Sequence, residues 1–94
     1  MKTSLVFLSK KAEKQLQKLP QHIKESVFLW SKTVEKIGIH ETRKCSGYHD
    51  EPLRGNRSGQ RSVRLNKAYR LFYEETSKKI EITIMIIEVN KHDY

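Results

Sequence analysis

The residue types best suited to chemistry are concentrated in residues 51–73, a basic segment with no acidic residue after Glu51 until the segment ends. Its cations are Arg54, Arg57, Arg61, Arg64, Lys67 and Arg70. A guanidinium group offers paired N–H donors that match two phosphate oxygens, and a rigid sheet would hold several such groups in fixed positions. The segment therefore predicts a surface that binds a phosphate backbone.

Groups that could transfer protons lie on both sides of these arginines: Glu51 precedes them, and His92 and Tyr94 follow the last predicted strand. Cleavage of an RNA phosphodiester without a metal needs a base for the 2′-hydroxyl, positive charge near the phosphorane, and an acid for the leaving 5′-oxygen. A carboxylate or imidazole can be the base, Arg70 can supply the charge, and histidine or tyrosine can be the acid. Taken singly, each residue also has an ordinary structural explanation. His49 remains an alternative to Glu51 as the base.

The other cations need no catalytic role, because a positively charged face is sufficient to bind an RNA backbone. The predicted RNA-binding residues are Arg54, Arg57, Arg61, Arg64 and Lys91. The formal net charge of +8 favours nucleic acid as the partner, ahead of an anionic membrane surface or an acidic protein.

Composition narrows the class of protein further. With 94 residues, 36% of them hydrophobic and 32% charged, the sequence fits one globular domain, residues 1–94. No apolar run approaches the roughly 20 residues that span a bilayer, and the run Leu5–Leu8 is too short for a signal peptide. The single cysteine, Cys45, excludes an internal disulfide and a cysteine-cluster metal site. We expect a cytoplasmic protein with no metal, no small-molecule cofactor and no membrane partner.

Two helices are predicted in the N-terminal part of the sequence. Ser9 is a suitable N-cap for a helix that runs to about Leu19. Pro20 cannot continue that helix but fits the opening of the next one, residues 21–37, which Gly38 ends. The two helices therefore form a hairpin.

One face of the second helix is apolar and must cover another element. Its apolar residues recur at steps of four and three, and they are Ile23, Val27, Trp30, Val34 and Ile37. Phe28 and Leu29 lie beside this stripe, where a widened buried face is favoured over a partner-binding surface. The predicted sheet is the one element available to receive the stripe.

The rest of the sequence has the patterns of strands and connections. The predicted strands are residues 5–8, 61–65, 69–73 and 80–89. Residues 39–50 are expected to form a polar surface loop, and residues 74–79 a polar hairpin turn. In residues 69–73, Tyr69, Leu71 and Tyr73 share one face, and Arg70 points away from them. Residues 80–89 are apolar on both faces, which predicts a central strand.

The element order is strand, helix, helix, strand, strand, strand. It predicts an α+β fold: a small, mostly antiparallel sheet with the N-terminal helical hairpin on one face. The opposite face is expected to be partly open and basic.

Three segments of the sequence resemble the RelE superfamily of bacterial type II toxin–antitoxin toxins, which includes RelE, YoeB, HigB and YafQ. These segments are EPLRGNRSG at residues 51–59, YRLFY at 69–73 and VNKHDY at 89–94. The resemblance covers essentially the whole chain. It implies a RelE/ParE-like fold and an mRNA interferase, an endoribonuclease that cuts ribosome-bound mRNA in the A site. It also implies a cognate antitoxin, for which we expect an acidic or amphipathic segment that covers the basic face.

The resemblance also implies roles for single residues. Glu51 matches the glutamate that is the general base in YoeB-like members, where HigB- and YafQ-like members have histidine. Arg54 matches a phosphate-contacting lysine, and Arg70 matches the arginine that stabilises the transition state. His92 matches a C-terminal general acid, and Tyr94 resembles a terminal tyrosine that shapes the site or stacks on a base.

The sequence departs from YoeB-like chains at two positions. Asp93 separates His92 from Tyr94, which are adjacent in that branch, and Arg61 replaces an aromatic residue. Two alternatives remain open on the same fold. One is a ParE-like DNA gyrase poison, which does not need Arg70 and His92 as an RNase pair; the other is a non-catalytic basic RNA- or ribosome-binding module.

Overall fold

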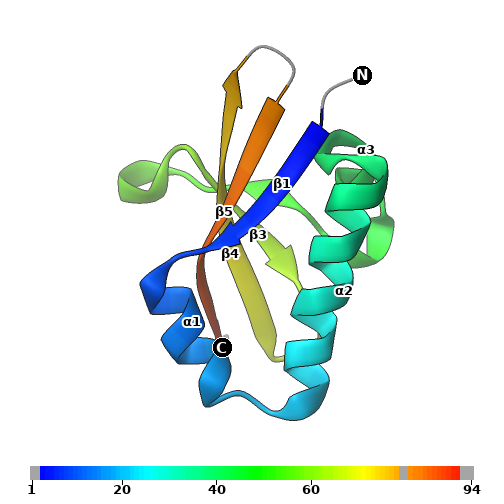
Figure 1. Ribbon diagram of the computed structural model, residues 1–94. Helices are drawn as coiled ribbons and strands as arrows, with labels where there is room; N and C mark the ends of the chain where they lie inside the picture. Colours follow the sequence, from blue (N-terminus) through cyan, green and yellow to red (C-terminus); the bar gives the residue numbers. More distant parts are fainter. Residues whose placement is uncertain (1–2, 79–80, 92–94) are drawn as a thin grey trace.

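The computed structural model describes residues 3–78 and 81–91, which form one five-stranded sheet and three α-helices (Figure 1). The strands are β1 (Thr3–Leu8), β2 (Glu51–Pro52), β3 (Gln60–Arg64), β4 (Tyr69–Lys78) and β5 (Glu81–Lys91). The helices are α1 (Lys10–Gln17), α2 (Gln21–Ile37) and α3 (Ile39–Arg43), with short 3-10 turns η1 (Ser46–Tyr48) and η2 (Gly55–Arg57). The sheet order is β1-β5-β4-β3-β2, and β1 pairs with β5 in parallel while the other pairs are antiparallel. The predicted α+β fold is confirmed.

The first helix begins where the sequence predicted, and its cap also attaches it to the sheet. The Ser9 hydroxyl accepts the Ala12 N–H at 3.0 Å and donates to the Ile87 carbonyl of β5 at 3.0 Å. β1 ends at Leu8 opposite Ile86, so the outer edge of β5 beyond that point has no strand beside it. The Gln15 side chain of α1 fills part of this gap, because its Oε1 accepts the Val89 N–H at 2.7 Å.

The second helix runs along the sheet, as Figure 1 shows, and its buried stripe forms one side of the core. Ile23, Trp30 and Val34 have no exposed surface, and Trp30 packs on Tyr73 of β4 with ring centroids 5.2 Å apart. Each large apolar side chain buried in this way contributes about 1.5–3 kcal/mol. Ile37 was predicted to belong to the stripe but is 46% exposed, because the helix ends immediately after it.

A β-bulge reverses the alternation of β5. Phe72 pairs with Glu88, but Tyr73 pairs with Ile86, so Ile87 is the extra residue. As a result Val89 is buried on the same face as Ile86, whereas strict alternation would place them on opposite faces. Glu88 therefore shares the other face of the sheet with Phe72. β5 has a neighbour on each side, as predicted for a central strand.

Two predicted connections are wrong. Residues 39–50 are not all loop, because Ile39 and Thr42 are buried in α3. Residues 74–79 are not all turn, because β4 continues to Lys78 and pairs with the start of β5. This extension passes the last pair between β3 and β4, Gln60 with Glu74, so its side chains can be polar without facing the core.

Candidate active site

Two arginines lie directly opposite each other on the face of the sheet turned away from α2. Arg64 of β3 pairs with Arg70 of β4, and Arg70 pairs with Asn90 of β5. Both residues are half-buried, and neither guanidinium group has an ion pair or hydrogen bond to another residue that the structure describes. Like charges directly opposite each other destabilise a sheet, so an anion bound between them would remove an unfavourable contact. This pair is the best candidate phosphate site of the molecule.

Glu51 lies on the same face, at the edge of the sheet. It pairs with Ser62, whose neighbour two positions along β3 is Arg64, and its side chain is exposed. Glu51 and Arg70 are two strands and two residues apart, so their Cα atoms are separated by about 12 Å from strand spacings alone. Side chains of this length can meet at one phosphodiester across that distance.

The η2 turn places Arg57 over the middle of this face. Its Cζ lies 4.3 Å from the centroid of the Phe72 ring, and its Nε donates to Gln60 Oε1 at 2.8 Å. Its Nη2 lies 3.6 Å from Glu88 Oε1. Arg57 is therefore held on the sheet by three neighbours.

Glu88 is a functional candidate that the sequence analysis missed. Its Oε1 accepts from Lys11 Nζ of α1 at 2.8 Å, and its Oε2 accepts from the Asn90 amide. Burial acts to raise the pKa of the Glu88 carboxyl, but the Lys11 hydrogen bond and the charge of Arg57 hold it below its usual value. Glu88 is thus an ionised carboxylate beside Arg57, on the same face of the sheet as Arg70. Strict alternation along β5 would place Glu88 on the helix-covered face, and it is the bulge at Ile87 that places Glu88 on the open face.

Arg61 does not lie with the other arginines. It shares the helix-covered face with Val63, and its Nε donates to Asp50 Oδ1 at 2.6 Å. The Asp50 side chain is 1% exposed, and its Oδ2 accepts the Tyr73 hydroxyl at 2.7 Å. Arg43 Nε in turn donates to the Tyr73 oxygen at 3.0 Å.

These side chains form a buried polar network that we define as Arg43, Asp50, Arg61, Tyr73 and Glu75, the last through an ion pair with Arg43. Burial raises the pKa of Tyr73, and its hydrogen bond to Asp50 raises it further, so the hydroxyl remains a donor. The network attaches Asp50, the residue immediately before Glu51, to β4 through Tyr73. The Arg61 guanidinium is therefore engaged by Asp50 on the helix-covered face, and it does not lie on the open face with Arg64 and Arg70.

The remaining predicted residues are dispersed. Arg54 is exposed just before η2, and Lys91 is exposed at the end of β5, where it pairs with Tyr69 on the other face from Arg70. His49 is exposed and ends η1 with a left-handed backbone, φ 44°. The predicted general acid His92 and the predicted stacking residue Tyr94 lie outside the described residues, so their roles stay predictions.

The part of the chain that the structure describes has neither a cluster suited to a metal ion nor a helix suited to a membrane. No group of three or more His, Cys, Asp and Glu side chains in residues 3–78 and 81–91 is placed to hold a metal ion. No helix among these residues is both long enough and apolar enough to cross a membrane.

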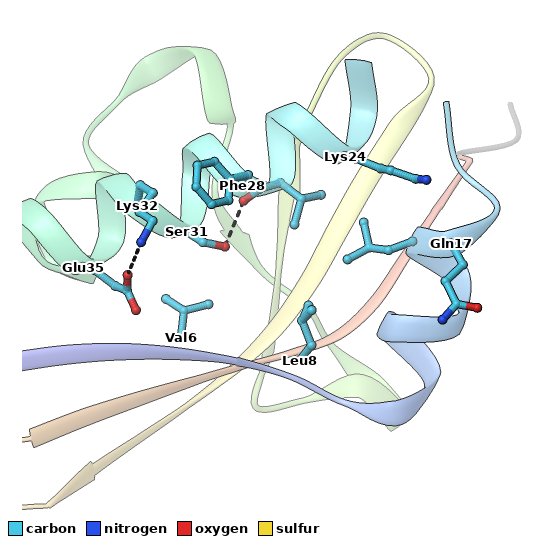
Figure 2. A pocket seen from close by; sticks show the side chains of 10 residues that line it. Val6, Leu8, Gln17, Lys24, Phe28, Ser31, Lys32 and Glu35 are labelled. Atoms are coloured by element: carbon cyan, nitrogen blue, oxygen red, sulfur yellow. Dashed lines mark hydrogen bonds and ion pairs between the residues drawn. The ribbon is translucent and has the colours of Figure 1, made fainter. Parts of the chain in front are cut away.

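A separate apolar groove lies between β1 and α2, and Figure 2 shows Val6 and Leu8 of β1 facing it together with Phe28 of α2. Its volume is about 480 Å³, and its rim carries Lys24, Lys32 and Glu35. Phe28 is 64% exposed and Leu29 63% exposed. The prediction that these two residues widen the buried face is therefore wrong, because most of each side chain is exposed.

No family model matches the sequence, and no curated protein matches it either. The similarity to solved structures is extensive. The YoeB/ParE toxin from Agrobacterium tumefaciens superposes with a TM-score of 0.74 at 16% identity, covering 95% of this chain and 99% of that one. The toxin–antitoxin complex RelBE2 from Mycobacterium tuberculosis gives a TM-score of 0.69 at 24% identity, covering 94% and 96%. The archaeal RelE–RelB complex from Pyrococcus horikoshii gives 0.69 at 23%, covering 95% and 94%. The chain has the fold of RelE- and YoeB-type toxins, which confirms at the level of the fold the resemblance predicted from the sequence.

Proposed function

We propose that this protein is the toxin of a type II toxin–antitoxin system and acts in the cytoplasm as a metal-independent endoribonuclease on ribosome-bound mRNA. The observation that carries the proposal is the direct opposition of Arg64 and Arg70 on the open face of a RelE/YoeB-like fold. Neither arginine has an acidic partner among the described residues, so both are available to a phosphate. Two guanidinium groups at one position suit a phosphorane, which carries more charge than the phosphodiester.

The reaction is an internal transfer that needs no external reactant. Glu51 takes the proton of the 2′-hydroxyl, and the 2′-oxygen forms a bond to the adjacent phosphorus. Arg70, with Arg64 beside it, stabilises the negative charge of the phosphorane. The bond from phosphorus to the 5′-oxygen then breaks, and His92 gives a proton to that oxygen while Tyr94 shapes the site. The products are a 2′,3′-cyclic phosphate and a 5′-hydroxyl.

The proposal assigns phosphate binding along the RNA to Arg54 and Lys91 in addition to Arg64. Both side chains are exposed; Arg54 lies just before η2, and Lys91 lies at the end of β5 on the other face of the sheet from Arg70. Arg61 is left out of this set, because Asp50 already holds its guanidinium.

The arginine pair can be tested by expressing the parent, Arg70→Ala and His92→Gln, with Lys78→Ala as the control for loss of a cation. Lys78 is exposed near the far end of β4. We expect the Arg70 variant to cleave mRNA about 10²–10³-fold more slowly, which is typical of losing one transition-state donor. Sequencing transcript 5′ ends after brief induction measures the cleavage and its codon position.

The outcomes separate this function from the alternatives. Undiminished mRNA cleavage by both the Arg70 and the His92 variants contradicts the assigned mechanism. DNA damage signalling by the parent without mRNA cleavage favours the gyrase-poison alternative. Salt-sensitive RNA binding by the parent without any cleavage product favours the RNA-binding module.

The partner in this proposal is a cognate antitoxin, and the apolar groove supports a second contact surface for it. The two RelE-type structures compared above were solved as complexes with their antitoxins. The exposed Phe28 and Leu29 lie beside the groove, and Lys24 and Lys32 on its rim suit an apolar segment that carries acidic residues. We expect Phe28→Ser to weaken co-purification with the product of the adjacent gene. Ile37→Ser, which changes an exposed residue of the same helix outside this groove, is the matched control, and equal binding by both variants contradicts this placement.

A further inference from the structure

We infer that Arg57 is a nucleobase-stacking residue that determines base preference, and that Glu88 and Gln60 position it. The inference rests on the proposed function, because the base belongs to the RNA strand whose phosphate lies between Arg64 and Arg70. It assigns Arg57 a different ligand from the phosphate contact that the sequence predicted.

Two of the three nitrogens of the Arg57 guanidinium already face polar partners. Its Nε donates to Gln60 Oε1 at 2.8 Å, and its Nη2 forms an ion pair with Glu88 Oε1 at 3.6 Å. Bidentate binding of a phosphate uses two neighbouring N–H groups on one edge. A phosphate bound through Nε and Nη2 would have to displace Gln60, and because Nη2 belongs to both bidentate edges, a phosphate at either edge would lie close to Glu88.

The flat face of the same guanidinium is the part that remains accessible. One face rests on the Phe72 ring, with Cζ 4.3 Å from the ring centroid, yet 38% of the Arg57 side chain is exposed. A guanidinium plane supported by an aromatic ring is a flat, rigid surface on which a base can stack. Arginine without such support would lose more conformational freedom on binding.

The charges around Arg57 also favour a base over a phosphate. Glu88 is ionised, since Lys11 and Arg57 lower the pKa of its carboxyl below the usual value despite its burial. A carboxylate beside Arg57 repels a phosphate, whereas a neutral base is indifferent to it. By contrast, Arg64 and Arg70 have no carboxylate partner among the described residues. The open face thus separates into a phosphate site at the arginine pair and a stacking site at Arg57.

The pairing of the strands places the phosphate site and the stacking site about as far apart as a phosphate and a neighbouring base in RNA. Arg57 lies over Phe72, and Phe72 is two residues from Arg70 along β4. Two residues of a strand span about 7 Å, which is close to the distance from a phosphate to the base of an adjacent nucleotide in an extended strand. One RNA strand can therefore occupy both sites together.

The test is binding of single-stranded 2′-O-methyl RNA of about ten nucleotides, a length within the usual site size. The 2′-O-methyl group prevents the internal attack, so binding is measured without cleavage. One abasic position is moved along the strand, and affinities are measured by fluorescence anisotropy over a range of salt concentrations. The proteins are the parent, Arg57→Gln, Arg64→Gln and Glu88→Gln.

For the parent, we expect an abasic substitution at one position to weaken binding about 10-fold, the usual size of a stacking contact. Arg57→Gln should bind intact RNA about 10-fold more weakly, lose that position dependence, and keep the salt slope of the parent. Arg64→Gln should instead lower the slope of log affinity against log salt by about 0.7, which corresponds to one phosphate contact on a single strand. Glu88→Gln retains the Arg57 side chain, but the loss of affinity at the abasic position should be smaller than in the parent, because Arg57 is then less well fixed.

Several results overturn the inference. A fall of about 0.7 in the salt slope of Arg57→Gln, with the abasic effect unchanged, makes Arg57 a phosphate contact. A parent that binds no RNA, or that binds without any dependence on an individual base, also overturns it. A parent that shows the base-dependent binding but does not cleave unmodified mRNA supports the stacking site and contradicts only the proposed function.

Discussion

Replacing Tyr73 by phenylalanine removes a single oxygen atom from the centre of the buried polar network. That oxygen donates to Asp50 Oδ2 at 2.7 Å and accepts from Arg43 Nε at 3.0 Å. The ring itself remains, so the packing of residue 73 on Trp30 is retained. The substitution therefore isolates the hydrogen bonds of the network from its apolar contacts.

The expected loss can be worked out from what each partner keeps. Asp50 keeps the hydrogen bond from Arg61 Nε at 2.6 Å, but its side chain is 1% exposed and water cannot replace the missing donor. Arg43 keeps its ion pair with Glu75 and is 22% exposed, so water can replace the missing acceptor there. Because hydrogen bonds to charged groups contribute about 1.5–3 kcal/mol each and one of the two is lost without replacement, we expect a decrease of about 2 kcal/mol in the free energy of unfolding.

The assay is urea unfolding followed by the fluorescence of Trp30, the one tryptophan in the sequence, which contacts residue 73 directly. Tyr69→Phe is the matched control, because Tyr69 lies on the same strand and its hydroxyl has no hydrogen bond to another described residue. We expect the control to change stability by less than about 0.5 kcal/mol. Since burial raises the pKa of Tyr73, the difference between the variants should be the same at about pH 7 and pH 9. Equal stabilities of the two variants would refute the assignment of the network as a stabilising element.

Three further changes test other features by the same unfolding measurement. Glu88→Gln should lower the free energy of unfolding at neutral pH. The pKa of the Glu88 carboxyl is lowered in the folded state, so its contribution to stability is present above the ordinary pKa of about 4.3. This contribution is lost as the pH falls through the folded-state pKa. A stability difference from the parent that persists unchanged in acid contradicts this. Ser9→Ala should cost about 1–2 kcal/mol, since the α1 cap and the bond to the Ile87 carbonyl are both lost, and a change within experimental error would mean that water replaces them. Gly38→Ala should lower the free energy of unfolding by about 1–3 kcal/mol, because φ is 88° there. The added Cβ would have no steric clash, since its nearest neighbour is Ser4 Oγ at 3.9 Å. A stability equal to that of the parent would therefore show that the backbone adjusts freely.

Local patterns predicted the helical hairpin correctly because the forces that form it act over a few residues. The hydroxyl of Ser9 caps the nearest free N–H groups, and Gly38 provides the positive φ at which α2 ends. The spacing of Ile23, Val27, Trp30 and Val34 was sufficient to identify the buried face. The position of Arg70 on the face opposite Tyr69, Leu71 and Tyr73 followed from alternation in the same way.

The features that the sequence did not predict depend on partners far away in the chain. The bulge in β5 results from its pairing with β4, and no residue in β5 signals it, so Glu88 was assigned no role. Asp50 was read as part of a surface loop, yet Arg61 and Tyr73 are 11 and 23 residues away. Arg61 was predicted to bind RNA from its charge, whereas its guanidinium donates to Asp50, 11 residues away, on the face of Val63.

The parallel pairing of β1 with β5 has a consequence for how the protein is made. Thr3 lies opposite Glu81, so the first strand to be synthesised cannot join the sheet until the last one has been added. Until then the hairpin of α1 and α2 has no complete surface to pack on, and contacts this distant in sequence form slowly. Arg64 and Arg70 pair within β3 and β4, but Asn90 can join them only when β5 is available. The arginine face with Asn90 beside it is therefore complete only once β5 has been synthesised and has paired with β4.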